Sequence, residues 1–355
     1  MNKYTVIMAG GVGIRFWPMS KSHFPKQFLN ITGKDAMINE TLNRSERITS
    51  WDKTFIVTGK SQSAVMEQVL MPEMPRDNIL YEPVAKNTAP CILYAALRIW
   101  EKYGDGVMCV LAADHHIPET TTFLRTMNTA VDAANTSGQA VVIGIKPTFA
   151  STGYGYIKCG AASAYSGIHK LDSFIEKPDH QRAIQYVESG AYLWNSGMFV
   201  WKVSTILELF ERFLPKMYNT FIAKKDCLGT PYEASAIASI YQAIEGISVD
   251  YGIMERLNEA LVVPGDFGWN DVGSWDTLDA VIPKDILGNV VNGQYIGIDS
   301  GGNTVQSQKL VATIGIQDMV IVEAEDAILV CPKARAQEVK TLVDELKARG
   351  MGQFA

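Results

Sequence analysis

The chain has 355 residues, of which 47% are hydrophobic and 20% are charged, and its formal net charge is −6. This composition is ordinary for a soluble globular protein, and the acidic balance argues against a nucleic-acid-binding protein, which usually has a basic face. No apolar run approaches the ~20 residues that span a bilayer.

The N-terminal residues enter a strand-like run at once, without the apolar region and cleavage site of a signal peptide. The five cysteines lie far apart and include no C-x-x-C pair; they are Cys91, Cys109, Cys159, Cys227 and Cys331. We therefore expect reduced thiols in a cytoplasmic protein.

Through the first half of the chain, short apolar runs alternate with segments of helical periodicity. The runs with strand character are 3–10, 54–59, 107–114 and 140–145. The helical segments between and around them are 36–48, 63–70, 87–104 and 123–138. This alternation predicts an α/β fold, a Rossmann-like domain with a mainly parallel central sheet whose ligands lie at the carboxyl ends of the strands.

The second half changes character near residue 286. Before it we expect strands at 172–178 and 197–203 and helices at 203–214 and 236–244. After it come short strands with Gly, Asn and Asp turns, and a charged amphipathic helix closes the chain. We therefore predict two domains, a catalytic domain of residues 1–285 and a β-rich C-terminal domain of residues 286–355. A short left-handed β-helix is one possible form of the C-terminal domain.

The segment "GGVGIR…PKQ" follows the first predicted strand and combines glycines with cations. Gly10, Gly11 and Gly13 let backbone N–H groups approach an anion closely. Arg15 offers a planar fork for two phosphate oxygens, and Lys26 offers a compact charge. The pattern predicts a phosphate-binding loop.

Two common phosphate-binding loops do not fit this chain. A Rossmann fingerprint requires a third glycine where Phe16 stands, and Pro18 and Pro25 interrupt a long helix. The segment "TFIVTGKS" ends like a Walker A motif, but Thr54 replaces its first glycine and a strand occupies the place of the loop. Both types are therefore excluded.

The glycine-rich segment resembles the signature of the sugar-1-phosphate nucleotidyltransferases, and "FWPMS" and "PKQF" are most similar to the mannose-1-phosphate guanylyltransferases. Further motifs of that family follow in order over most of residues 4–276: "EPVAKNTAP", "AADHHI", "TGYGYIK", "FIEKP", "WNSGMFVW", "DYGIME" and "WNDVGSWD". Longer relatives continue into a cupin-like phosphomannose isomerase domain. Because this chain stops at Ala355, we do not expect that second activity.

The resemblance implies transfer of GMP from GTP to mannose 1-phosphate, giving GDP-mannose and pyrophosphate by metal-assisted in-line attack on the α-phosphate. Such a reaction needs positioning and charge neutralisation rather than a side-chain nucleophile. We expect Arg15 to hold pyrophosphate and Lys26 to meet the α-phosphate. Asp114 and Asp271 are the expected Mg²⁺ ligands. The alternatives are a strand-end turn residue for Asp114 and a helix cap for Asp271, although Ser274 could provide that cap.

The nucleotide-binding residues implied are the three loop glycines with Glu82, Asn87 and Thr88. A single carboxylate can accept both N1–H and N2–H of guanine, which makes Glu82 the candidate for base recognition. Asn87 and Thr88 would add polar contacts at the start of a helix. The alternative is that the "EP" pair forms a turn and Thr88 caps the helix.

The sugar phosphate is expected to meet Gly155, Glu176, Lys177 and Asn195. Glu176 would accept from sugar hydroxyls while Lys177 meets the phosphate. Because neighbours on an extended strand face apart, one of the two is structural unless the chain kinks before Pro178. For Asn195 the alternative is a turn residue.

Two further groups are not expected to carry the chemistry. His115 and His116 resemble a metal-binding pair, but adjacent residues on an extended chain point opposite ways, so we expect them to pack around the site. Tyr154 and Trp194 are interpreted as core aromatic residues.

Two other functions remain open. The first is the same reaction with another hexose 1-phosphate or another NTP. The second is a nucleotide-sugar-binding regulatory subunit without catalysis, which the presence of Lys26, Asp114 and Asp271 disfavours. We expect a homodimer that binds neither nucleic acid nor membrane. Its β-rich tail should serve assembly rather than the active site, and pack on the catalytic domain or on a second subunit.

Overall fold

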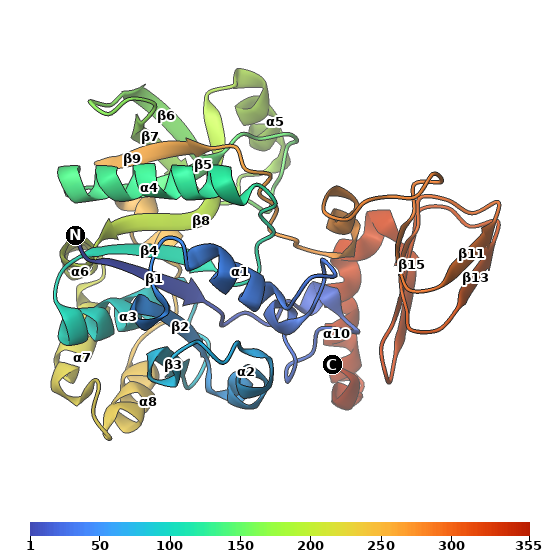
Figure 1. Cartoon of the computed structure of the whole chain (residues 1–355), viewed down its shortest axis with the longest axis horizontal. Helices are drawn as coiled ribbons and strands as arrows, with labels where there is room; N and C mark the ends of the chain where they lie inside the picture. The colour runs from blue at the N-terminus through green and yellow to red at the C-terminus, as the bar shows by residue number, and fades with distance from the viewer.

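The computed structural model describes residues 1–355, in which a large α/β part carries a smaller β-rich part at one side (Figure 1). The strands of the large part are β1 (Lys3–Met8), β2 (Thr54–Gly59), β3 (Ile79–Glu82), β4 (Val107–Ala112), β5 (Ala140–Ile145), β6 (Tyr156–Ala162), β7 (His169–Ile175), β8 (Tyr192–Lys202) and β9 (Ala260–Gly265). Its helices are α1 (Met37–Ser45), α2 (Ser63–Val69), α3 (Thr88–Tyr103), α4 (Thr120–Ser137), α5 (His180–Ser189), α6 (Val203–Phe213), α7 (Pro215–Ile222), α8 (Glu233–Ala243) and α9 (Val249–Gly252).

The large part is built on one nine-stranded sheet with the order β3-β2-β1-β4-β8-β5-β9-β7-β6. Strands β3, β2, β1 and β4 run parallel to one another, and so do β5 and β9. Strands β6, β7 and β8 pair antiparallel to their neighbours. The α/β prediction is confirmed, but the sheet is mixed rather than mainly parallel. One contribution comes from β6 and β7, which are joined by a connection too short for a helical crossover and therefore pair antiparallel, and another comes from β8, which pairs antiparallel to both β4 and β5.

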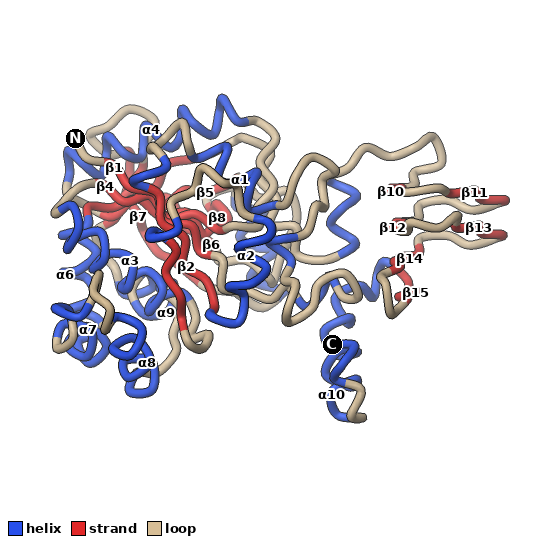
Figure 2. The backbone as a smooth tube through the Cα atoms, turned by 60° about the horizontal axis from the view of Figure 1, so that its bottom comes forward, coloured by secondary structure: helices blue, strands red, loops and turns tan.

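Helices cover both faces of the sheet (Figure 2), and the strands β1, β2, β4 and β5 are buried on both sides. Alternate residues of one strand enter different cores: Val110 packs with α3 and α6, whereas Cys109 and Leu111 pack with α4. This alternation follows from the two-residue period of a strand. It explains why the predicted strands read as continuous apolar runs.

The C-terminal strands stack as a parallel coil. They are β10 (Val290–Asn292), β11 (Tyr295–Ile298), β12 (Thr304–Gln306), β13 (Val311–Ile314), β14 (Met319–Glu323) and β15 (Ile328–Pro332). Strands β10, β12 and β14 pair parallel in that order, as do β11 and β13, and β15 adds antiparallel to β14. The β-rich prediction is therefore confirmed, while the handedness of the coil stays a prediction. We propose that the boundary between the two parts lies near residue 285, before β10.

The closing helix α10 (Val339–Ala348) lies between the two parts (Figure 1). The 3₁₀ helices around this junction are η1 (Ile14–Phe16), η2 (Lys26–Phe28), η8 (Trp275–Ala280), η9 (Lys333–Glu338) and η10 (Gly352–Phe354). One buried apolar cluster joins side chains of η1, η8, the C-terminal strands and α10. The expected packing of the tail on the catalytic domain is therefore confirmed. None of the helices combines the length and the apolar character that a membrane crossing requires.

Candidate active site

The glycine loop follows β1 directly, as predicted, and steric constraints require a glycine at position 13. Gly13 has a φ of +68°, and a Cβ on it would lie 2.2 Å from the Cβ of Lys26. Any side chain at this position would therefore displace the lysine segment. The side chain of Gln27 stabilises the loop, because its Nε2 donates to the backbone oxygens of Ala9 at 2.6 Å and Gly11 at 2.9 Å.

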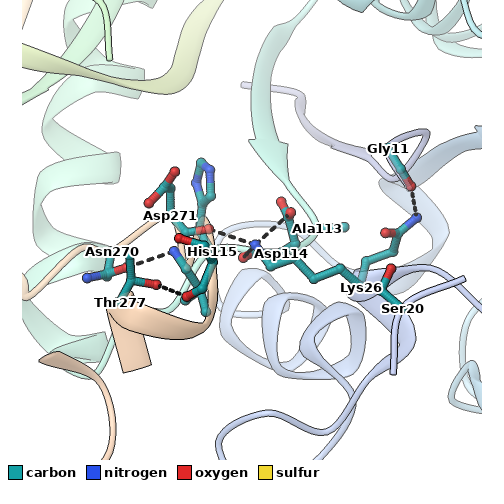
Figure 3. Close-up of polar contacts among 12 residues, drawn as sticks. Gly11, Ser20, Lys26, Ala113, Asp114, His115, Asn270, Asp271 and Thr277 are labelled. Atoms are coloured by element: carbon teal, nitrogen blue, oxygen red, sulfur yellow. Dashed lines mark hydrogen bonds and ion pairs between the residues drawn. The ribbon is translucent and has the colours of Figure 1, made fainter. Parts of the chain in front are cut away.

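Lys26 lies at the centre of the site and is buried, with 4% of its surface exposed. Its Nζ donates to Asp114 Oδ2 at 2.9 Å, to the Asp114 backbone oxygen at 3.1 Å and to the Asp271 backbone oxygen at 2.7 Å (Figure 3). An ammonium group has three protons, so these contacts use its full donor capacity. The lysine can therefore meet a phosphate only by releasing one of these acceptors.

Both residues predicted as metal ligands contact Lys26, Asp114 through its carboxylate and Asp271 through its backbone oxygen, although they come from distant parts of the chain. Asp114 follows the end of β4, and Asp271 lies in the segment that pairs with it through the His116–Asn270 bridge. The hydroxyl of Tyr154 donates to Asp271 Oδ1 at 2.7 Å.

Asp271 does not cap a helix in the structure. Ser274 occupies the position before η8, and Asp271 instead accepts the hydrogen bond from Tyr154. Its carboxylate therefore has no capping role and contacts Tyr154.

The electrostatics of this centre keep Asp114 ionised. Burial alone would raise the pKa of Asp114, but the Lys26 ammonium and His115 together bring that pKa below its ordinary value. Burial lowers the pKa of His115 against the attraction of Asp114 and Asp271, so its ring is neutral near pH 7. The Nε1–H of Trp269 donates to His115 Nδ1 at 3.1 Å.

Arg15 lies on η1 with its side chain exposed to solvent. The next two residues are buried, Phe16 completely and Trp17 with 6% of its surface exposed. The turn is therefore anchored by its aromatic residues, while its guanidinium stays available to a ligand.

The predicted base-recognition residue, Glu82, lies beside the glycine loop. The hydroxyl of Tyr241 donates to Glu82 Oε1 at 2.6 Å, and Oε2 would lie 3.2 Å from a Cβ placed on Gly10. Because Tyr241 occupies one oxygen, Oε2 is the one left for a ligand. Burial raises the pKa of Glu82 to about 7, although the hydrogen bond from Tyr241 acts in the opposite direction.

Asn87 and Thr88 have structural contacts at the start of α3. Asn87, with a φ of +71°, precedes the helix, and its side chain accepts from the backbone N–H of Thr88. The Thr88 hydroxyl accepts from the N–H of Val249 at 2.9 Å. The cap of this helix is therefore Asn87 rather than Thr88.

The structure resolves the two alternatives for the Glu176–Lys177 pair in favour of a kink. Lys177 has a φ of +46°, in the left-handed region, which turns the chain directly before Pro178. As a result the Nζ of Lys177 lies 3.3 Å from Glu176 Oε1, and the two charged groups meet. Glu176 also lies against Gly155, where a Cβ would approach its Oε2 to 2.4 Å.

Asn195 and Asp250 complete this pocket. The Nδ2 of Asn195 donates to Asp250 Oδ1 at 2.9 Å, and its backbone N–H donates to the Gly155 oxygen at 2.8 Å. Burial, followed by repulsion from Asp250, raises the pKa of Glu176 to about 7, against the attraction of Lys177. Two carboxyl groups, an amide and an ammonium therefore form one polar cluster.

The chain is similar to known proteins over nearly its whole length. A nucleotidyl transferase family model matches residues 4–286, and a "MannoseP isomerase/GMP-like beta-helix domain" model matches residues 293–346. A mannose-1-phosphate guanylyltransferase of Klebsiella pneumoniae is 38% identical over 354 residues, which cover 98% of this chain and 75% of that protein. The chain belongs to the mannose-1-phosphate guanylyltransferase family.

Other members and a solved structure extend this result. The xanthan biosynthesis protein XanB of Xanthomonas campestris is 37% identical over 98% of this chain and 74% of its own length. A crystal structure described as mannose-1-phosphate geranyltransferase from Thermus thermophilus superposes with a TM-score of 0.88 at 31% identity. That match covers 98% of this chain and all of the other.

Three polar residues of the site were not assigned from the sequence. Asp250 lies in the family motif "DYGIME", so that motif was a usable signal, whereas nothing local marks Tyr241 as the partner of Glu82. Tyr154 was interpreted as a core aromatic residue, but its hydroxyl contacts Asp271. Its phenol combines an apolar body packed on Trp269 with a polar end in the site.

Proposed function

We propose that this protein transfers the GMP unit of GTP to mannose 1-phosphate, giving GDP-mannose and pyrophosphate. The observation that carries the proposal is the junction at which Lys26 meets Asp114 and Asp271 beside the glycine loop, in a chain of this family. This junction brings a buried cation and two carboxylates to the end of the sheet where a nucleotide would bind.

The reaction is a direct substitution at phosphorus. A phosphate oxygen of mannose 1-phosphate forms a bond to the α-phosphorus, and the bond from that phosphorus to the bridging oxygen of pyrophosphate breaks. The attacking phosphate is already ionised at neutral pH, so no general base is required. The side chains therefore act by orienting two polyanions and neutralising their charge.

In this scheme the glycine loop admits the triphosphate, and Arg15 holds the departing pyrophosphate. Lys26 exchanges its contact with Asp114 Oδ2 for an oxygen of the α-phosphate, since all its protons are otherwise engaged. Asp114 would then be free to hold a divalent cation, which would supply charge neutralisation there.

The donor set of the site fits Mg²⁺. Asp114 receives Lys26 on Oδ2 and Asp271 receives Tyr154 on Oδ1, so each carboxylate keeps its other oxygen for a metal. Magnesium in nucleotide sites takes one or two carboxylates and completes its shell with phosphate oxygens and water. When bound, the ion supplies charge neutralisation at the phosphates.

The two substrates are recognised at opposite sides of this junction. Glu82 Oε2 accepts from the guanine edge, near the start of α3. Glu176, Lys177 and Asn195 hold the sugar phosphate around Gly155, with Lys177 meeting the phosphate and Glu176 accepting from sugar hydroxyls.

A coupled assay of pyrophosphate release tests the proposal, with GTP and mannose 1-phosphate in the presence of Mg²⁺. The same assay is run with ATP, UTP and dTTP and with glucose, galactose and fucose 1-phosphates. The highest kcat/KM is expected for GTP with mannose 1-phosphate. A higher value for another pair would favour the alternative substrates, and no turnover with any pair would favour a regulatory binding subunit.

We further propose that the protein acts in the cytoplasm as a homodimer. The support for assembly is a set of exposed apolar side chains on β11 and β13, namely Ile296, Ile298 and Ile314. Light scattering on the full chain tests this stoichiometry.

A further inference from the structure

The turn that carries Arg15 packs against the C-terminal end of the chain. Trp17 and Phe16 belong to the same buried cluster as Val339 and Val343 of α10. Helix α10 contacts η1 directly, and in Figure 1 it lies next to the segment that precedes α1. The β-rich tail was expected to serve assembly, and its final helix packs against the exposed arginine turn.

Two indole hydrogen bonds fix Trp17 from both sides. Its Nε1–H donates to the backbone oxygen of Phe354 at 2.6 Å, almost at the end of the chain. Its own backbone oxygen accepts from the Nε1–H of Trp275 at 3.0 Å. The residue two positions after Arg15 is therefore tied to η10 and to η8 at once.

The same contacts reach the catalytic lysine. The ring of Phe16 packs on Trp275 with a centroid distance of 4.8 Å, and the Nζ of Lys26 lies 5.6 Å from the centroid of the Phe16 ring. A displacement of α10 would therefore be transmitted to Arg15 through the backbone of η1 and to Lys26 through the ring of Phe16.

Such support matters because η1 is only three residues long. The turn is closed by two backbone hydrogen bonds, from Phe16 N–H to Gly13 and from Trp17 N–H to Ile14. A single 3₁₀ turn is weak alone, so its position depends on what its side chains pack against.

We propose that the C-terminal segment, α10 with η10, is a positioning element for pyrophosphate, and that it acts by holding the Arg15 turn through Trp17. The inference rests on the proposed role of Arg15. Trp17 itself touches no substrate in this scheme, so it is a positioning residue rather than a catalytic one.

The experiment is a double-mutant cycle in the pyrophosphorolysis direction, with GDP-mannose and pyrophosphate as substrates. Trp17→Phe removes the indole N–H and keeps an aromatic ring. Removal of residues 351–355 deletes the acceptor of the same hydrogen bond. The matched control is Leu342→Ala, an exposed position on α10. Thermal unfolding of every variant is recorded alongside.

We expect Trp17→Phe and the deletion each to raise the KM for pyrophosphate about threefold to tenfold, the size of one lost hydrogen bond. The KM for GDP-mannose should change by less than about twofold, and Leu342→Ala should match the parent. In an Arg15→Ala background, Trp17→Phe should have no further effect on the KM for pyrophosphate, because coupled residues are not additive.

Three outcomes would overturn the proposal in distinguishable ways. If Arg15→Ala alone leaves the KM for pyrophosphate unchanged, the role of Arg15 fails, and the positioning role fails with it. If Arg15→Ala raises that KM but Trp17→Phe adds its full effect in that background, the arginine role stands and the C-terminal segment does not act through it. If Trp17→Phe and the deletion lower only the melting temperature, their contacts are structural.

Discussion

Lys26 donates a hydrogen bond to the backbone oxygen of Asp271 at 2.7 Å, although the two residues are 245 positions apart. The same ammonium contacts the carboxylate of Asp114 at 2.9 Å. One buried cation therefore fixes the relative position of the two segments that carry the proposed metal ligands. The first prediction follows from this arrangement.

Lys26→Ala should lower kcat about 10²–10³-fold, or about 3–4 kcal/mol, the scale of losing one charge-stabilising donor. The KM for GTP should change much less, because the glycine loop and Arg15 still hold the triphosphate. Lys26→Arg should recover little, since a planar guanidinium does not fit a buried site that Gly13 closes from one side. Steady-state kinetics and thermal unfolding on one preparation measure both effects.

The control for this variant is Lys34→Ala, an exposed lysine in a following loop. It should leave kcat unchanged. A normal kcat in well-folded Lys26→Ala would refute the proposed role of the lysine at the α-phosphate.

Asp114→Asn and Asp271→Asn should reduce turnover far more than they reduce the free energy of unfolding, because each removes a proposed metal ligand. Tyr154→Phe should have a graded effect. It keeps both carboxylates but frees Asp271 Oδ1, so the Mg²⁺ concentration for half-maximal rate should rise about tenfold or more. Titration of the rate with MgCl₂ measures this. The control for Tyr154→Phe is Tyr186→Phe, which lies outside the site. Full activity of Asp114→Asn or Asp271→Asn at limiting Mg²⁺ would contradict the metal assignment.

Glu82→Gln should weaken GTP binding more than mannose 1-phosphate binding and should flatten its pH dependence. In the folded protein Glu82 keeps its proton up to about pH 7, against an ordinary pKa of 4.5. The KM of the parent enzyme for GTP should therefore rise as the pH falls below about 7, where the carboxylate is lost. If the KM values for both substrates shift together in Glu82→Gln, or neither shifts, Glu82 does not recognise the base.

The raised pKa of Glu82 also has a consequence for stability. Between pH 4.5 and 7 the folded state binds more protons than the unfolded state, so the free energy of unfolding should fall as the pH rises through this interval. Glu82→Gln should reduce that slope. Denaturant unfolding at several pH values measures it.

Asp250→Ala should raise the KM for mannose 1-phosphate while leaving the KM for GTP within about twofold, because it releases the amide of Asn195 in the sugar pocket. Initial-rate kinetics with each substrate varied in turn measure the difference. Asp266→Ala, at an exposed position, is the control. An equal rise in both KM values would indicate a general loss of structure instead.

Ile298→Arg combined with Ile314→Arg should convert the proposed homodimer into a monomer, because the two side chains are register partners on β11 and β13 and are 58% and 75% exposed. A charge on both would leave two cations unpaired in an apolar interface. Light scattering measures the mass. An unchanged mass would show that another surface forms the dimer, or that none does.

The strands and helices of the first half could be predicted from the sequence because their signals are local. Periodicity alone placed β1, β2, β4 and β5 and the helices α3 and α4. The partner of each strand is not encoded locally, so the antiparallel insertion of β8 between β4 and β5 was missed. The sequence left the kink at Lys177 undecided for the same reason, because a single positive φ depends on the residues that pack around it.

The sequence by itself determined the glycine loop after β1, the α/β fold, the β-rich tail and the family, because glycines, cations and acids at fixed spacings limit the chemistry. Only the tertiary structure decided which groups meet. It brought Lys26 between Asp114 and Asp271, seated Tyr154 on Asp271, and packed α10 beneath the Arg15 turn. The physical reason is that burial and hydrogen bonding join segments from opposite ends of the chain, and a linear pattern carries no record of those contacts.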